Sequence, residues 1–322
     1  MADAVALNRW NGSDVRLGAV VDTMAQLRRS VARTASRTWV MTLVAVAAND
    51  DEVYQATQVM RALGAHHPAR FLLIQPQPGA DTVGVDASVT IYGTDVNGHP
   101  LTFDQIALTV RGDAAHHLDS IVEPFTLSDL PIVVWYPATL PPVSEPLLAK
   151  ATSVLVDTKD AHDVAGLIAL AGRKAIVDLS WVRLRTWREM VAALFEPAEF
   201  RPFVRQITEA RVEGKGGPRR LLAGWLASRL SLAKPQLELH DARHARIVLH
   251  AGTAATFEVS RETGERLVRA TATIAGGARH SELLPLPDDS LAWSLAEALT
   301  HLGRDRVWQQ ALAAGVAADA WA

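Results

Sequence analysis

The segment at residues 116–137, HHLDSIVEPFTLSDLPIVVWYP, constrains the fold more than any other part of the chain. Its first half carries apolar residues at helical spacing, and a short polar break follows. The run from Pro131 to Tyr136 is then β-branched and aromatic, and Pro137 ends it. A continuous apolar run of this kind is typical of a strand that is covered on both faces. The segment therefore predicts a helix that leads into a buried strand of an α/β sheet.

Short apolar runs alternate with amphipathic stretches through the first part of the chain. Residues 83–92 and 104–110 predict two antiparallel strands, either an insertion or an edge of the sheet, joined by a turn at Asn97-Gly98. Strands that alternate with helices are typical of parallel sheets covered by helices. We therefore expect residues 1–198 to form a doubly wound, mainly parallel α/β domain.

The pattern changes after FEPAEFRPF at residues 195–203, where two prolines interrupt a polar stretch. Short strands then follow one another from about residue 236 to about residue 284, with turn residues between them, and two helical stretches come after them. This order predicts a smaller α+β domain with a mainly antiparallel sheet over residues 199–322.

Composition excludes several classes of protein. The net charge is −3 and the pI is near 6.4, so the chain has no electrostatic reason to bind nucleic acid. The run from Trp39 to Ala48 is too short to cross a membrane, and the first residues do not resemble a signal peptide. There is no cysteine, which excludes thiolate chemistry and cysteine metal ligands. We expect a cytoplasmic protein.

Three aspartates follow predicted strands, namely Asp50, Asp157 and Asp178. One interpretation is a site at the sheet edge for a nucleotide, a sugar phosphate or a magnesium ion, because ligands of α/β sheets bind at the carboxyl ends of strands. The other is that each acid caps or favours the helix that follows, which short polar side chains commonly do. The second is favoured, since no GxGxxG or Walker motif is present. The histidine pairs at 66–67 and 116–117 do not make chelating sites by themselves, so we expect no metal and no cofactor.

Two further groups of residues suggest binding. In GKGGPRR, at 214–220, Lys215, Arg219 and Arg220 follow glycines and precede a helix, which is a candidate anion site; a flexible, solvated connection is the alternative. Tryptophan and arginine are enriched at protein interfaces. The candidate partner-binding residues are Trp135, Tyr136, Trp181, Arg185 and Arg188. We find no arrangement of residues that predicts catalysis.

Four motifs occur in an order that resembles one known family. They are HHPAR (66–70), DLPIVVWYP (129–137), SWVRLRTWREM (180–190) and LLAGWLASRL (221–230). Together they resemble the glucose-6-phosphate dehydrogenase assembly proteins, called OpcA, and the resemblance extends over nearly the whole chain. Tyr136 is a departure, because the family pattern has a second tryptophan there.

The resemblance implies a non-catalytic partner protein. Members of this family bind glucose-6-phosphate dehydrogenase and promote its assembly or its active state in the oxidative pentose phosphate pathway. By resemblance we expect this chain to be an assembly factor and allosteric activator of that enzyme. The alternative is a nucleotide- or sugar-phosphate-binding sensor or enzyme that uses Asp50, Asp157 and Asp178.

Overall fold

A computed structural model describes residues 4–31, 39–64, 67, 69–96, 99–127, 129–261 and 266–318 of the chain. Its contacts form two compact units, each drawn from segments that are separate in the sequence. The first unit comprises Met1–Asp157, Arg173–Val177 and Leu291–Gly303, and the second comprises Thr158–Gly172, Asp178–Ser290 and Arg304–Ala322. The units interleave along the chain, and the boundary between residues 198 and 199 stays a prediction about sequence domains.

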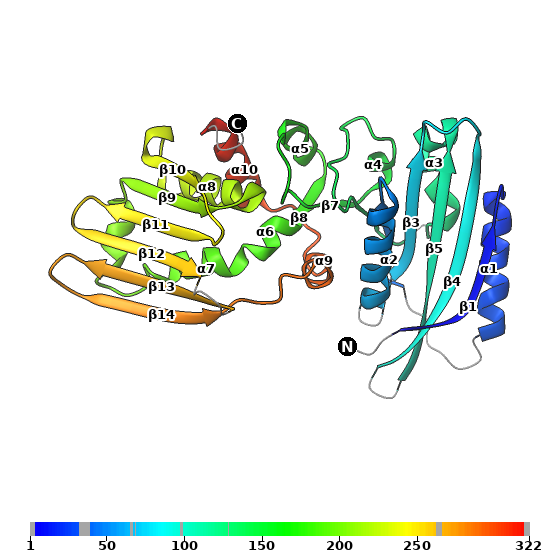
Figure 1. Ribbon diagram of the computed structural model, residues 1–322, viewed down its shortest axis with the longest axis horizontal. Helices are drawn as coiled ribbons and strands as arrows, with labels where there is room; N and C mark the ends of the chain where they lie inside the picture. Colours follow the sequence, from blue (N-terminus) through cyan, green and yellow to red (C-terminus); the bar gives the residue numbers. More distant parts are fainter. Residues whose placement is uncertain are drawn as a thin grey trace. The chain divides into compact units, whose positions relative to one another are not determined.

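The first unit is built on an eight-stranded sheet in the order β1-β4-β5-β3-β2-β6-β7-β8. Figure 1 shows β1, β4, β5 and β3 side by side. The strands are β1 (Val5–Gly12), β2 (Met41–Val46), β3 (Ala69–Gln77), β4 (Gly84–Val96), β5 (His99–Arg111), β6 (Ile132–Trp135), β7 (Ser153–Val156) and β8 (Ala175–Asp178). Neighbours from β5 through β3, β2 and β6 to β7 are parallel, and β4 is antiparallel to both β5 and β1. From β2 the chain moves outward to β3 and β5, and later outward on the other side to β6, β7 and β8. This is the order of a doubly wound sheet, so the predicted fold class is confirmed for this half.

The segment at 116–137 folds as its pattern predicts. A helix, α3 (Leu118–Val122), and a 3-10 turn, η2 (Glu123–Phe125), lead into β6. Pro131 lies just before β6, where its carbonyl accepts a hydrogen bond from Thr42 N at 2.9 Å. The proline therefore removes no donor from the sheet.

The predicted hairpin is present and longer than expected. β4 and β5 pair from Gly84 and Arg111 up to Val96 and His99, while Asn97 and Gly98 lie outside the described residues. β1 was not expected, because its alternating sequence leaves Val5 and Leu7 exposed at the sheet edge instead of buried. An edge strand is packed on fewer sides than a central one, so its sequence carries fewer apolar residues by which it could be predicted.

Helices cover the sheet of the first unit. Their bounds are α1 (Leu17–Val31), α2 (Asp50–Gly64), η1 (Gly112–His116), α4 (Leu147–Lys150) and α9 (Leu291–Leu299). α1 packs against β1 and β4, α2 packs against β3 and β5, and α9 packs against α2. β2, in the middle, is buried along its whole length, as expected for a strand with helices on both faces.

A buried charged cluster lies beside this sheet. Arg28 forms an ion pair with Asp104, whose side chain is 4% exposed. Arg28 and Arg70 both stack on Trp39, with guanidinium carbons 4.7 Å and 4.6 Å from the ring centroid. Arg70 Nη1 donates to the carbonyl of Phe125 at 2.6 Å. Burial, and secondly the nearby Arg28, lower the pKa of Arg70, while Asp104 opposes this effect. The Asp104 carboxylate thus offsets the positive charge of both Arg28 and Arg70.

The second unit contains a six-stranded sheet in the order β10-β9-β11-β12-β13-β14. Its elements are α5 (Ala165–Ala171), α6 (Leu179–Arg183), α7 (Arg185–Ala193), η3 (Arg201–Arg205), β9 (Glu209–Gly214), α8 (Gly216–Leu230), η4 (Lys234–Gln236), β10 (Leu237–Asp241), β11 (Arg246–Ala251), β12 (Ala255–Arg261), β13 (Leu267–Ile274), β14 (Arg279–Pro285) and α10 (Arg306–Ala317). All neighbouring strands are antiparallel except β10 and β9. The predicted mainly antiparallel sheet is confirmed.

α8 is buried around most of its surface. It packs against β9 and β10 and also against α10. A side chain at Gly224 would meet the carbonyl oxygen of Ala311 at 2.0 Å, so this glycine permits the close approach of α10. Within the described residues, no helix has the length and apolar character needed to cross a membrane.

Candidate interaction site

In a doubly wound sheet, dinucleotides bind where the strand order reverses, which here is between the carboxyl ends of β2 and β6. In this chain, side chains of Asn49 and Glu52 bond the backbone amides at this position. Asn49 Oδ1 accepts from Glu52 N at 3.0 Å, and Glu52 Oε2 accepts from Ala48 N at 3.0 Å. This arrangement resembles a capping box, except that Glu52 bonds the amide of Ala48, one residue before the cap. It places a carboxylate, on a residue that is 8% exposed, at the N-terminus of α2. A nucleotide phosphate would need the same amides.

Two of the three sheet-edge aspartates, Asp178 and Asp50, have different partners, and the third, Asp157, is half-buried directly after β7 (Ser153–Val156). Asp178, which is 1% exposed, accepts four hydrogen bonds at 2.7–3.2 Å, from Thr158 N, Thr158 Oγ1, Ser180 N and Trp308 Nε1. It also caps α6. Asp50 accepts from Gln75 Nε2 at 2.7 Å, while Asn49 caps α2 in its place.

No metal-binding group emerges from these acids or from the histidines. The described part of the chain holds no cluster of three or more histidine, aspartate or glutamate side chains suited to a metal ion. His116 and His117 are both exposed, and His66 lies outside the described residues. For Asp178, whose oxygens are already bonded, the capping interpretation accounts for its position.

Two of the predicted partner-binding residues lie together in the second unit. The guanidinium carbon of Arg188 is 3.6 Å from the ring centroid of Trp181, and Arg188 Nη2 donates to the Trp181 carbonyl at 3.3 Å. Trp181 Nε1 in turn donates to Asp305 Oδ2 at 2.7 Å, and Asp305 caps α10. Burial lowers the pKa of Arg188 to about 10, while Asp305 opposes the shift. Arg185 is half-buried, three residues before Arg188 on α7.

Trp135 and Tyr136 lie in the core of the first unit. They are 0% and 3% exposed, and neither Trp135 Nε1 nor Tyr136 OH has a hydrogen-bond partner among the described residues. Burial, and secondly Glu145, raise the pKa of Tyr136. A direct contact of either side chain with a partner stays a prediction; in this structure both fill the sheet interior.

The residues of GKGGPRR bind within their own unit. Arg219 Nη1 donates to Asp241 Oδ1 at 2.7 Å, and Arg220 Nη1 donates to the Ala161 carbonyl at 2.8 Å. The Gly217 amide donates to the carbonyl of Lys159 at 2.8 Å, so this amide is already bonded at the start of α8. Lys215 is exposed. These contacts agree with the structural alternative, and the anion site stays a prediction.

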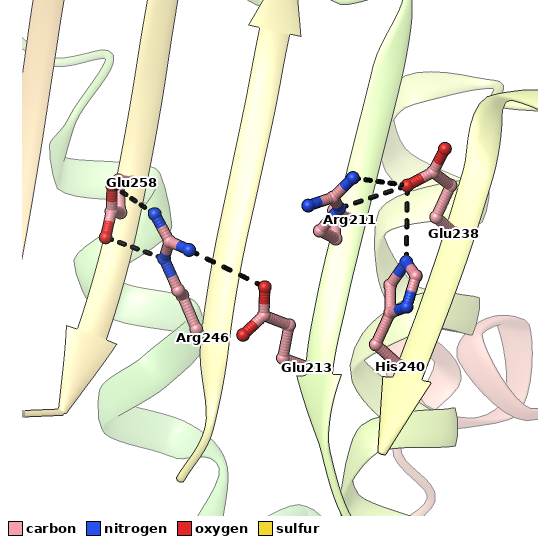
Figure 2. A network of polar contacts seen from close by, with 6 residues as sticks. All are labelled: Arg211, Glu213, Glu238, His240, Arg246 and Glu258. Atoms are coloured by element: carbon pink, nitrogen blue, oxygen red, sulfur yellow. Dashed lines mark hydrogen bonds and ion pairs between the residues drawn. The ribbon is translucent and has the colours of Figure 1, made fainter. Parts of the chain in front are cut away.

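A charged network on the second sheet was not expected. Arg246 makes two hydrogen bonds to Glu258, at 2.8 Å and 3.1 Å, and its Nη1 lies 3.6 Å from Glu213. Figure 2 shows these side chains in front of the strands, with helices behind. The alternating burial of β9 and β12 places charged residues on this face and apolar residues on the face toward α7 and α8.

The network continues on the neighbouring strands. Arg211 Nε donates to Glu238 Oε2 at 3.0 Å, and His240 Nε2 lies 3.3 Å from the same oxygen (Figure 2). The alternation of charged and apolar residues in EARVEG, at 209–214, was the available signal for an exposed sheet face. The pairing of particular charges depends on strand order, which sequence alone does not give.

The Arg246–Glu258 pair predicts a pH-dependent stability. The hydrogen bond from Arg246 lowers the pKa of Glu258, so the stabilisation is present above the unfolded pKa and is lost as pH falls through the lower folded pKa. We expect Arg246→Gln to cost about 0.5–1 kcal/mol near neutral pH, a small value because the pair is partly exposed, and clearly less near about pH 3. Denaturant unfolding at both pH values measures this. The exposed Arg243→Gln is the matched control, and an equal cost at both pH values would contradict the assignment.

Comparison with known families matches both halves of the chain. Residues 60–171 match the N-terminal domain, and residues 174–312 the C-terminal domain, of the glucose-6-phosphate dehydrogenase subunit OpcA. Putative OxPP cycle protein OpcA of Synechocystis sp. is 28% identical over 192 residues, which cover 55% of this chain and 40% of that protein. Its counterpart in Synechococcus elongatus is 30% identical over 137 residues, which cover 38% of this chain and 31% of that protein. The matches therefore span 40% or less of these curated relatives.

Solved structures were compared as well. Glucose-6-phosphate 1-dehydrogenase from Mycobacterium avium aligns with a TM-score of 0.47 and 9% identity, over 86% of this chain and 90% of that chain. GenD2 from gentamicin A biosynthesis, in complex with NAD, aligns with a TM-score of 0.38 and 10% identity, over 90% of this chain and 95% of that chain.

The two family matches follow one another along the chain with a gap of only two residues, 172–173. They include β3 to β8 of the first sheet and most of the second unit. The family resemblance of the sequence motifs is thereby confirmed: the chain belongs to the OpcA family of glucose-6-phosphate dehydrogenase assembly proteins.

Proposed function

We propose that this protein binds glucose-6-phosphate dehydrogenase and favours its active oligomeric state in the oxidative pentose phosphate pathway, as an allosteric activator without catalysis of its own. The observation that carries the proposal is the match of both halves of the chain to domains of the OpcA subunit of that enzyme. The chain spans part of its relatives' length, so the partner and the activating effect are inferred from the family.

The geometry of the first sheet supports a binding role over catalysis. The carboxylate of Glu52 occupies the helix N-terminus at which a dinucleotide fold normally holds phosphate. The carboxylate of Asp178 is fully used by four donors. These hydrogen bonds favour a structural role for both carboxylates over nucleotide binding or proton transfer.

We place the contact with the dehydrogenase around Arg185 and Arg188 on α7. The ring of Trp181, fixed by its bond to Asp305, holds the Arg188 guanidinium in one orientation. An arginine that is already ordered loses little conformational entropy when a partner covers it. Arg188 is also partly desolvated within the folded chain, as its lowered pKa indicates. A partner that covers it therefore removes less water from the guanidinium than from a fully hydrated one. These properties are typical of residues that dominate interface energies.

Activation requires tighter binding to the active state of the enzyme than to the inactive one. A tenfold preference corresponds to about 1.4 kcal/mol, which one well-placed arginine can supply. We expect the two purified proteins to co-elute on size exclusion as a larger species, with higher dehydrogenase activity across that peak. Unchanged elution and unchanged activity at saturating amounts of this protein would overturn the proposal.

Substitution of Arg188 tests the placement of the contact. We expect Arg188→Ala to weaken the complex by about tenfold or more, and the exposed Arg205→Ala in the same unit to leave it within about twofold. Unfolding curves of both variants show whether the loss is local. If Arg188→Ala binds as tightly as the unchanged protein, the contact lies elsewhere, although the complex itself still stands.

A further inference from the structure

The first unit contains a hollow of about 360 Å³ on the face of its sheet. Residues of β1, β3, β4 and β5 line it, and Val53 of α2 closes one side. Its polar side chains are Asn11, Ser13, Gln75, Asp86, Ser88 and Thr109. A sheet face that is covered by a helix normally carries valine, leucine and isoleucine. Asn11 and Ser13 are exposed, but Gln75, Asp86, Ser88 and Thr109 are half-buried, and the polar character of these four is the feature to explain.

Strand register brings the polar side chains together. Asp86 pairs with Thr109, which pairs with Gln75, in one row across β4, β5 and β3. Asn11 pairs with Ser88 in the neighbouring row, across β1 and β4. The two rows are two residues apart along the strands, so their side chains point to the same face. Gln75 and Thr109 lie near the carboxyl ends of parallel strands, where α/β sheets bind their ligands.

Several of these groups have no partner within the protein. Among the described residues, the side chains of Asn11, Ser13, Ser88 and Thr109 make no hydrogen bond, although each can donate or accept. Gln75 donates its amide to Asp50 and leaves its carbonyl oxygen toward other donors. Unpaired donors and acceptors that converge on one hollow are typical of a binding site for a polar small molecule.

The charges around the hollow select the class of ligand. No lysine or arginine of the described residues lines it, and the neighbouring Arg111 is bonded to both Asp86 and Asp14. Asp86 also accepts from Asp14 N at 3.0 Å. An anionic ligand would find no free cation here and would approach carboxylates. A compound with several hydroxyl groups would match a lining that both donates and accepts hydrogen bonds.

We propose that this hollow binds an uncharged polyhydroxylated molecule of monosaccharide size. Ser88 and Thr109 bond its hydroxyl groups from the sheet, and Val53 and Leu73 contact its apolar side. Ala107, which pairs with Ser88 and shares its face, is small and leaves the room that the ligand fills. This site is separate from the proposed contact on α7, and the proposal does not depend on binding of the dehydrogenase.

The test is saturation-transfer NMR and calorimetry on the full chain, with D-glucose, myo-inositol and glucose 6-phosphate as probes. We expect a neutral probe to bind at concentrations up to about 50 mM, and glucose 6-phosphate to bind at least about tenfold more weakly than glucose. If no neutral probe binds in this range, or if the phosphate ester binds more tightly than glucose, the proposal is wrong.

Two variants localise the binding. Thr109→Val keeps the side-chain shape and removes the hydroxyl, and Ser88→Leu fills the hollow. Both should weaken binding by about tenfold. Thr271→Val, on the exposed face of the second sheet, is the matched control and should bind normally. Thr109→Val keeps the shape of a half-buried side chain, and its unfolding curve shows whether it is folded. Equal binding by this folded variant and the control would overturn the assignment even if Ser88→Leu were unstable.

Discussion

Replacing Asp178 with alanine should destabilise the second unit by about 3–5 kcal/mol, which corresponds to a fall in Tm of roughly 10 °C. The carboxylate accepts from Thr158, Ser180 and Trp308 in a buried setting, and its loss leaves these donors without an acceptor. The helix cap of α6 is lost as well. Chemical denaturation, followed by tryptophan fluorescence and circular dichroism, measures the change.

Two comparisons make this result specific. Asp178→Asn keeps one acceptor oxygen for the helix cap and should lose less stability than alanine. Asp160→Ala, at an exposed position in the same unit, should change the free energy of unfolding by no more than about 0.5 kcal/mol. An Asp178→Ala protein with unchanged stability that had lost a response to nucleotide or Mg²⁺ would restore the interpretation of this acid as part of a ligand site.

The second large effect is expected from Asp104→Ala in the first unit. Its carboxylate is the counter-charge for Arg28, and it opposes the lowering of the Arg70 pKa. Without it, two guanidinium groups stack on Trp39 with no anion between them. Breaking one partner of a buried pair costs about 3–5 kcal/mol, and we expect a loss of that size.

A second-site change distinguishes charge from packing. Asp104→Ala combined with Arg28→Met removes one of the two cations and should be more stable than Asp104→Ala alone. Asp51→Ala, on the exposed surface of α2, is the control and should have almost no effect. Equal stability of the single and double variants, measured by urea unfolding, would show that repulsion between the arginines is not the cause.

Local patterns predicted the buried parts of the fold well. The apolar run that ends at Trp135 became a strand that is buried from Val133 to Trp135, because a central parallel strand needs apolar residues on both faces. β1 was missed because an edge strand lacks that requirement. The helix cap at Asn49 was assigned to its neighbour Asp50, since both residue types favour the position and only the hydrogen bond distinguishes them.

The candidate site was less predictable, because its contacts join distant segments. Trp181 and Arg188 were singled out by residue type, and their stacking follows from the junction of α6 and α7. The bond from Trp181 to Asp305 spans 124 residues and leaves no local signal. The polar hollow depends in the same way on the register of β1, β4, β5 and β3. Periodicity shows which face a side chain occupies, whereas strand order decides which side chains meet.

The interleaving of the two units has a consequence for synthesis on the ribosome. α9, which packs against α2, belongs to the first unit but is translated only after nearly all of the second. During synthesis, the side of α2 that will contact α9 therefore stays exposed until the segment that forms the second sheet has been translated. Nascent polypeptides that end before residue 291 should bind chaperones through this exposed side of α2. Packing of α9 is then one of the last steps in folding of the first unit.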